Sequence, residues 1–155
     1  VKFAMLRNIS SRFKYSCFVN IVEEMELNLY PESQRSVLFD LLSYANKIEL
    51  NRLVLTTHSP YVINYLTLAA KAFLLTQKIS ANETLQERIK EVVPADSAID
   101  PARLRIYELK DGGVFRLSTY EGLPSDENFL NIQLGVTNEL FDQLLEIEQE
   151  FDYKN

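Results

Sequence analysis

Three residues that could take part in phosphate chemistry follow two short apolar segments of the chain. Glu23 and Glu24 come directly after residues 17–22, and His58 comes directly after residues 53–57. A carboxylate can help to hold Mg²⁺ or can accept a proton from an attacking water, and an imidazole can hydrogen-bond an anionic oxygen. The three residue types together would suit phosphoryl transfer, provided that the fold brings them to one place.

The two apolar segments are typical of strands buried on both faces of a parallel sheet. Between them, Pro31 predicts the start of a helix that runs to about Glu49, and a second amphipathic helix follows Pro60. Strand, helix, strand, helix is the order of right-handed crossover units, which place helices over a parallel sheet. Since parallel strands end at the same edge of a sheet, the acids and the histidine should meet there.

Each signal also has an ordinary structural interpretation. Glu23 and Glu24 could be no more than a solvated loop, and His58 could precede a simple helix cap formed by Ser59 and Pro60. The occurrence of both signals at the ends of two consecutive strands favours a catalytic site over either separate explanation.

The remaining elements follow from periodicity and turn residues. We expect a helix over residues 3–13, a short helix near 84–92, a hairpin whose strands flank Asp111-Gly112-Gly113, and a final helix over 138–152. The glycines of the hairpin should supply the positive φ angles of its turn. The single cysteine, Cys17, should be buried in the first strand, and the aromatic residues Tyr107, Phe115 and Tyr120 should pack the hairpin.

Composition indicates an ordinary globular protein. The 155 residues are 46% hydrophobic and 25% charged, with a formal net charge of -6, which argues against disorder and against a surface that binds nucleic acid all over. One cysteine, no apolar stretch of membrane-spanning length and no leader sequence predict a cytoplasmic protein without a membrane partner. A first residue that is valine predicts a fragment of a longer chain.

A wider pattern of motifs carries a family resemblance. The strand ending in Glu23-Glu24 is followed by Leu27-Asn28-Leu29-Tyr30-Pro31, and the next strand ends in Thr57-His58-Ser59-Pro60. In order and spacing, residues 16–73 resemble the C-terminal half of an ABC-type ATPase domain of the SMC/RecF/OLD-like group, which includes many prokaryotic AAA family ATPases. The resemblance implies an α/β fold with a parallel sheet flanked by helices, the C-terminal lobe of a P-loop NTPase, followed by a C-terminal β-hairpin and helix. On this basis we expect an ATPase lobe over 1–78, a connecting segment over 79–102, and the hairpin and helix packed on the same domain over 103–155.

The resemblance also assigns roles to individual residues. It implies that Glu23 is the Walker B acid that supports Mg²⁺, that Glu24 is the general base, and that His58 is the switch histidine. Asn28, in the D-loop position, and Ser59 are implied as nucleotide-binding residues. ATP and Mg²⁺ would be the ligands, and a homodimer would form through the ATPase heads.

The departures from the family pattern limit what this chain could do alone. No G-x-x-x-x-G-K-[ST] phosphate loop occurs in the sequence, and Met25 stands where the family usually has proline. We therefore expect an upstream N-terminal lobe that carries Walker A, and little ATP hydrolysis without it. The alternative is a non-enzymatic interaction domain that retains the ATPase shape. DNA or an effector protein stays open as a further partner.

Overall fold

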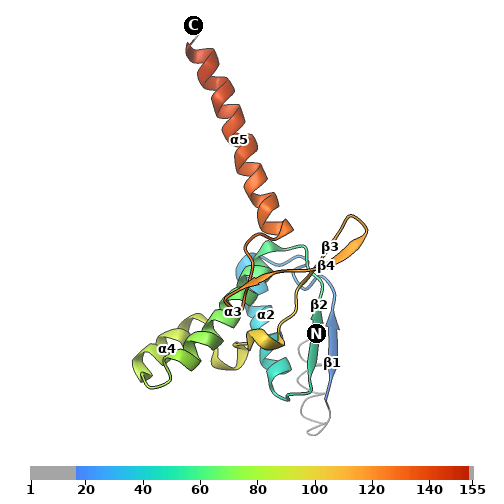
Figure 1. Ribbon diagram of the computed structural model, residues 1–155, viewed down its shortest axis with the longest axis vertical. Coiled ribbons are helices and arrows are strands. Elements are labelled where there is room, and N and C mark those ends of the chain that lie inside the picture. Colours follow the sequence, from blue (N-terminus) through green and yellow to red (C-terminus); the bar gives the residue numbers. More distant parts are fainter. Residues whose placement is uncertain (1–16, 154–155) are drawn as a thin grey trace.

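The computed structural model of the chain describes residues 17–153 (Figure 1). The expected helix over residues 3–13 lies outside this part of the chain. In order, the elements are β1 (Val19–Val22), α2 (Pro31–Asn46), β2 (Arg52–Leu55), α3 (Pro60–Lys78), α4 (Glu83–Val92), two 3-10 turns (Ala95–Ser97 and Pro101–Arg103), β3 (Tyr107–Lys110), β4 (Gly113–Arg116), β5 (Thr119–Tyr120), β6 (Leu123–Pro124) and α5 (Phe129–Tyr153).

The strand-helix-strand unit that was expected around α2 is present. β1 and β2 pair in parallel, with Val19 opposite Arg52 and Val22 opposite Leu55, and α2 connects them. Within residues 17–153 this parallel sheet has two strands, and the other two sheets are short antiparallel hairpins. The protein is thus a mixed α/β structure, whereas a broad parallel sheet flanked by helices is not seen in the described residues.

Burial of both faces of the first strand is a wrong prediction. Val19 is 69% exposed and Ile21 is 65% exposed, while Val22 on the alternate face packs against the core. Successive side chains of a strand point to opposite faces, so a continuous apolar sequence does not by itself show that both faces are covered. Cys17 lies before β1 and is exposed, so its expected burial is also wrong.

The hydrophobic core lies between α2 and α3. Leu38 and Leu42 of α2 and Val62 and Leu66 of α3 are among its buried members. Both helices start with proline at their first positions, as expected, since the missing N–H is harmless there. α2 ends at Asn46, somewhat before the predicted end near Glu49.

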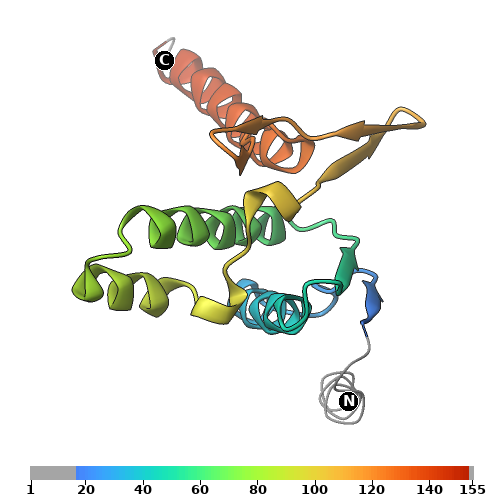
Figure 2. The same cartoon turned by 60° about the horizontal axis from the view of Figure 1, so that its bottom comes forward.

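The segment after α3 folds back onto this core. α4 lies beside α3 in Figure 2 and matches the short helix predicted near 84–92. Its N-cap is Asn82, whose side chain accepts a hydrogen bond from the Leu85 N–H. Farther on, the buried Ser97 hydroxyl donates to the Phe39 carbonyl at 2.9 Å, which joins the 3-10 turn to α2.

The predicted hairpin is formed by β3 and β4. Its turn residues with positive φ are Asp111 (51°) and Gly112 (73°), not the two glycines, and positive φ at both central positions is the mark of a type I′ turn. The expected packing by its aromatic residues is wrong, because Tyr107, Phe115 and Tyr120 are all exposed.

A second hairpin, between β5 and β6, was not predicted from the sequence. It turns at Glu121 and Gly122, where φ is also positive. These strands have two residues each, too few for a periodic sequence signal.

The last helix, α5, starts at Phe129, well before the expected start at residue 138, and extends away from the rest of the molecule (Figure 1). The buried Asn128 side chain accepts the N–H of Asn131 at 3.0 Å and so caps the helix. Beyond its first turns the apolar side chains of α5 are exposed, which differs from the packed helix that its periodicity suggested. In the described part of the chain, no helix combines the length and apolar character that crossing a membrane requires.

Candidate functional site

The candidate site lies where β1 and β2 end. Because the two strands are parallel, the residues that follow them emerge at the same edge of the sheet. The Glu24 N–H donates to the Thr56 carbonyl at 3.0 Å and to the Thr56 hydroxyl Oγ1 at 3.1 Å. Thr56 therefore fixes the backbone of Glu24 directly beside the segment that leads to His58.

Glu24 and His58 are brought together, as the sequence predicts. His58 Nε2 lies 3.7 Å from Glu24 Oε1, and the two side chains are 84% and 49% exposed, respectively. A side-chain contact as exposed as this contributes little to the stability of a fold. The geometry leaves both groups accessible to a ligand from solvent.

The backbone of Glu24 has an unusual conformation. Its φ is 45°, in the left-handed region, where a residue with a Cβ is disfavoured by about 1–2 kcal/mol. Asn28, four residues later, also has a positive φ of 61°, in a turn closed by hydrogen bonds from the Leu27 N–H to the Glu24 carbonyl and from the Leu29 N–H to the Glu26 carbonyl. Strained backbone of this kind is often found at ligand sites.

Glu26 is a residue of this site that the sequence interpretation did not single out. Its Oε1 accepts a hydrogen bond from the backbone N–H of His58 at 2.6 Å, so its carboxylate links the turn after β1 to the segment after β2. Its other oxygen, Oε2, is buried and has no hydrogen-bond partner within residues 17–153. The sequence signal was the third glutamate of the Glu23–Glu26 run, which local patterns alone do not separate from a solvated loop.

Ser59 lies in the site region, but its hydroxyl faces inward. It is buried, and its Oγ donates to Gln34 Oε1 at 2.6 Å, while Gln34 Nε2 donates to the Leu29 carbonyl. Ser59 occupies the N-cap position of α3 without making a side-chain cap. Its hydroxyl thus connects α2, α3 and the turn after β1.

Glu23 and Asn28, the other two predicted site residues, are both exposed at this edge of the sheet. No group of three or more His, Cys, Asp or Glu side chains that could hold a metal ion occurs among residues 17–153. Mg²⁺ in nucleotide sites commonly takes one or two carboxylates, with phosphate oxygens and waters as its other ligands. An exposed carboxylate such as that of Glu23 fits this mode of binding.

Comparison with protein families finds a similarity over the segment that contains the candidate site. Residues 19–64 match an AAA domain. The description of that family model links it to the AbiEii toxin of type IV TA systems. The matched segment contains Glu23, Glu24, Asn28, His58 and Ser59, and it supports a P-loop ATPase family of the AAA type. No curated protein and no solved structure matches the chain.

Proposed function

We propose that this chain forms the C-terminal half of an ABC-type ATPase domain of the SMC/RecF/OLD-like group, which binds and hydrolyses ATP. The observation that carries the proposal is the 3.7 Å approach of Glu24 Oε1 to His58 Nε2, at one edge of a parallel strand pair and inside the segment that matches an AAA domain. Open α/β sheets bind their ligands at the carboxyl ends of the strands, which is where both residues lie.

Glu24 is the general base in this proposal. Its carboxylate accepts the proton of a water that attacks the γ-phosphorus, while the bond to the leaving ADP oxygen breaks. The hydrogen bonds from the Glu24 N–H to Thr56 support this role, because they hold the backbone of Glu24, from which the carboxylate extends, where the sheet ends. His58 hydrogen-bonds the γ-phosphate or the attacking water from the neighbouring strand.

Glu23 supports Mg²⁺ beside the general base. When bound, the cation neutralises charge on the phosphate oxygens. Glu23 precedes the turn that carries Asn28, and in the proposed dimer this turn faces the partner head and contributes to its nucleotide site. Ser59 contributes through its backbone and its contact with Gln34, since its hydroxyl is already hydrogen-bonded.

A complete site needs groups that this sequence does not contain. We propose that a lobe carrying the phosphate loop supplies the lysine and the backbone amides that hold the β- and γ-phosphates. The two parts together are called the assembled ATPase below. ATP binding would close a head-to-head dimer, and hydrolysis would reopen it. If the chain is instead a non-enzymatic interaction domain, the carboxylates and the histidine have no effect on nucleotide.

The test is to measure Mg²⁺-dependent ATP affinity and dimer fraction for glutamine variants of the assembled ATPase. Glu24→Gln should still bind ATP and should accumulate the closed dimer, because binding is retained while the step that reopens the dimer is lost. Glu23→Gln should weaken the Mg²⁺-dependent binding and trap little dimer.

The matched control is Glu121→Gln. Glu121 is also an exposed glutamate with a positive φ, of 51°, but it lies in the β5–β6 turn. Its variant should behave like the parent protein. Equal affinity and equal dimer fraction in all three variants would argue against nucleotide roles for Glu23 and Glu24.

A further inference from the structure

Glu26 makes the contact that holds the backbone of His58. Its Oε1 accepts the backbone N–H of His58 at 2.6 Å, across 32 positions of the sequence. His58 lies between the end of β2 at Leu55 and the start of α3 at Pro60. Within residues 17–153, this is the only hydrogen bond that joins the backbone of Thr57 or His58 to another segment. Glu26 therefore determines where the backbone of His58 lies.

The position of the His58 imidazole depends on this placement of the backbone. The side chain is 84% exposed, and its Nε2 lies 3.7 Å from Glu24 Oε1. A ring as exposed as this has few packing contacts to orient it, so the position of its backbone decides whether it meets the Glu24 carboxylate. Misplacement of a reacting group by about 1 Å can lower a rate by about 100-fold.

The turn that carries Glu26 is itself fixed to the rest of the molecule. Met25 is buried and belongs to the hydrophobic core, and the Glu26 carbonyl accepts the Leu29 N–H at 2.9 Å. Farther along the turn, Gln34 Nε2 donates to the Leu29 carbonyl at 2.9 Å. The Glu26 carboxylate thus extends from an anchored backbone, and this allows it to define the position of His58.

The oxygen atoms of Glu26 differ from those of a ligand-binding carboxylate. Oε1 accepts the His58 N–H, and Oε2 is buried and has no hydrogen-bond partner among residues 17–153. A buried carboxylate oxygen without a partner costs free energy on folding. Stability alone therefore gives no reason for a glutamate at this position, whereas the placement of His58 does.

We infer that Glu26 is a positioning residue that places His58 opposite Glu24. The inference rests on the proposed function, because the position of the imidazole affects the rate only where His58 acts on the nucleotide. Glu26 does not touch the nucleotide and acts through the backbone of His58. Loss of its carboxylate should therefore lower kcat, with a smaller effect on the KM for ATP.

The first measurement is amide hydrogen exchange of the 155-residue chain, followed by NMR. In Glu26→Ala the His58 N–H loses its acceptor, so its exchange should become roughly tenfold faster or more. Glu26→Gln keeps an oxygen that can accept this N–H, so it should retain most of the protection. Because the chain contains a single histidine, the ring signals of His58 are unambiguous, and they should shift more in Glu26→Ala than in Glu26→Gln.

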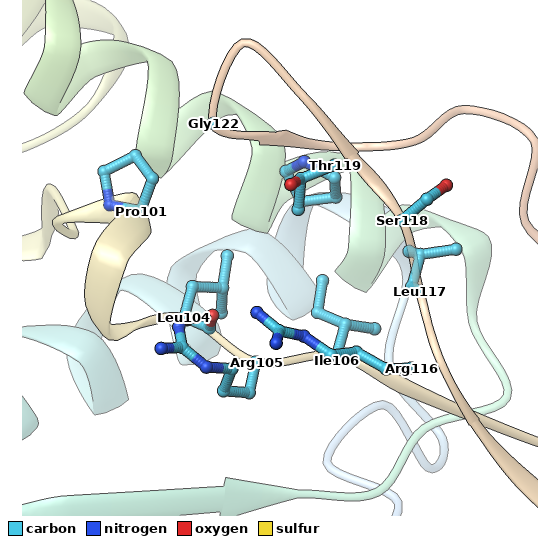
Figure 3. Close-up of a pocket in the computed structure, with 10 residues that line it drawn as sticks. Pro101, Leu104, Arg105, Ile106, Arg116, Leu117, Ser118, Thr119 and Gly122 are labelled. Carbon is cyan, nitrogen blue, oxygen red and sulfur yellow. Dashed lines mark hydrogen bonds between the residues drawn. The ribbon is translucent and has the colours of Figure 1, made fainter.

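The matched control is Glu108→Ala. Glu108 Oε1 accepts the backbone N–H of Phe129, also at 2.6 Å and also from a distant part of the sequence. Glu108 lies on β3, which begins directly after Ile106 of the shallow pocket drawn in Figure 3, and no residue of the candidate site lines that pocket. Glu108→Ala should speed exchange at Phe129 and should leave the His58 signals and ATP hydrolysis unchanged.

The second measurement is steady-state ATP hydrolysis by the assembled ATPase. Glu26→Ala and His58→Ala should each lower kcat by roughly tenfold or more, and Glu26→Gln should retain most of the parental rate. A residue that acts only through the imidazole has no further effect once the imidazole is removed. The double variant should therefore turn over at the rate of His58→Ala, whereas a merely structural role of Glu26 would lower the rate in both backgrounds.

Three outcomes would overturn the inference alone. Unchanged exchange at His58 in Glu26→Ala would show that the carboxylate does not hold this N–H. Losses in kcat that multiply in the double variant would show that Glu26 acts independently of His58. A parental rate for Glu26→Ala, in an enzyme that Glu24→Gln inactivates, would remove the positioning role and leave the proposed function intact. If Glu24→Gln itself hydrolyses ATP at the parental rate, the proposed function fails, and the positioning role fails with it.

Discussion

Glu24 combines an exposed carboxylate with a left-handed backbone conformation. Its N–H is held by both oxygens of Thr56, and its side chain lies 3.7 Å from His58. Folding does not gain from placing a glutamate at a φ of 45°, where glycine would be favoured. A carboxylate required at this position for chemistry gives a physical reason for the strain.

Replacement of Glu24 by glycine and by alanine should separate the strain from the loss of the side chain. Both changes remove the carboxylate, but only alanine keeps a Cβ in the left-handed region, so Glu24→Gly should be more stable than Glu24→Ala by about 1 kcal/mol. Urea unfolding of the 155-residue chain measures this difference. At Glu49, which does not have a positive φ, the same pair of substitutions should not favour glycine. Equal stability of the two Glu24 variants would show that the left-handed conformation of Glu24 does not destabilise the fold.

The contacts around His58 show how much of the site could be predicted. Glu24 and His58 meet because two parallel strands are joined by one helix. The apolar runs of the sequence predict the strands, and Pro31 predicts the start of the helix. The hydrogen bond from the His58 backbone N–H to Glu26 depends on how the turns are placed in three dimensions. The same holds for the hydrogen bond from the Ser59 hydroxyl to Gln34. Sequence periodicity carries no information on such contacts.

At the level of elements, the sequence predicts the type of most helices and strands better than it predicts which of their faces are covered. β1 was recognised as a strand, but the exposure of Val19 and Ile21 depends on whether another element covers that face. For α5, the apolar repeat indicated a helix from residue 138, although the cap at Asn128 starts it earlier and Gly135 lies in its interior. Glycine in a helix lowers its intrinsic stability, which weakened the sequence signal there.

Gly135 offers a direct test of the extent of α5. A Cβ built at Gly135 would meet no atom within 4 Å, so Gly135→Ala should stabilise the helix by roughly 0.5–1 kcal/mol. Thermal unfolding followed by circular dichroism should show a higher midpoint and no loss of helical signal. Gly122→Ala is the comparison, since φ is +80° at Gly122 and this change should destabilise the chain. Destabilisation by Gly135→Ala would argue against a continuous helix through this residue.

At the level of the whole molecule, the proposed function concerns the surroundings of the candidate site. The carboxylates and His58 lie at an open sheet edge, and the exposed face of β1 provides apolar surface beside it. Phosphoryl transfer depends almost entirely on positioning and on charge stabilisation, so the proposed function requires that another lobe add phosphate-binding groups to the residues after β1 and β2.

The most direct test of the account is the steady-state rate of ATP hydrolysis by the assembled ATPase and by its Glu24→Gln variant. The account predicts that Glu24→Gln lowers kcat by about 100-fold or more, because general-base catalysis contributes that much and glutamine keeps the shape of the side chain. Glu121→Gln should retain the parental rate, and the 155-residue chain alone should show negligible turnover. A Glu24→Gln variant that hydrolyses ATP at the parental rate would contradict the account.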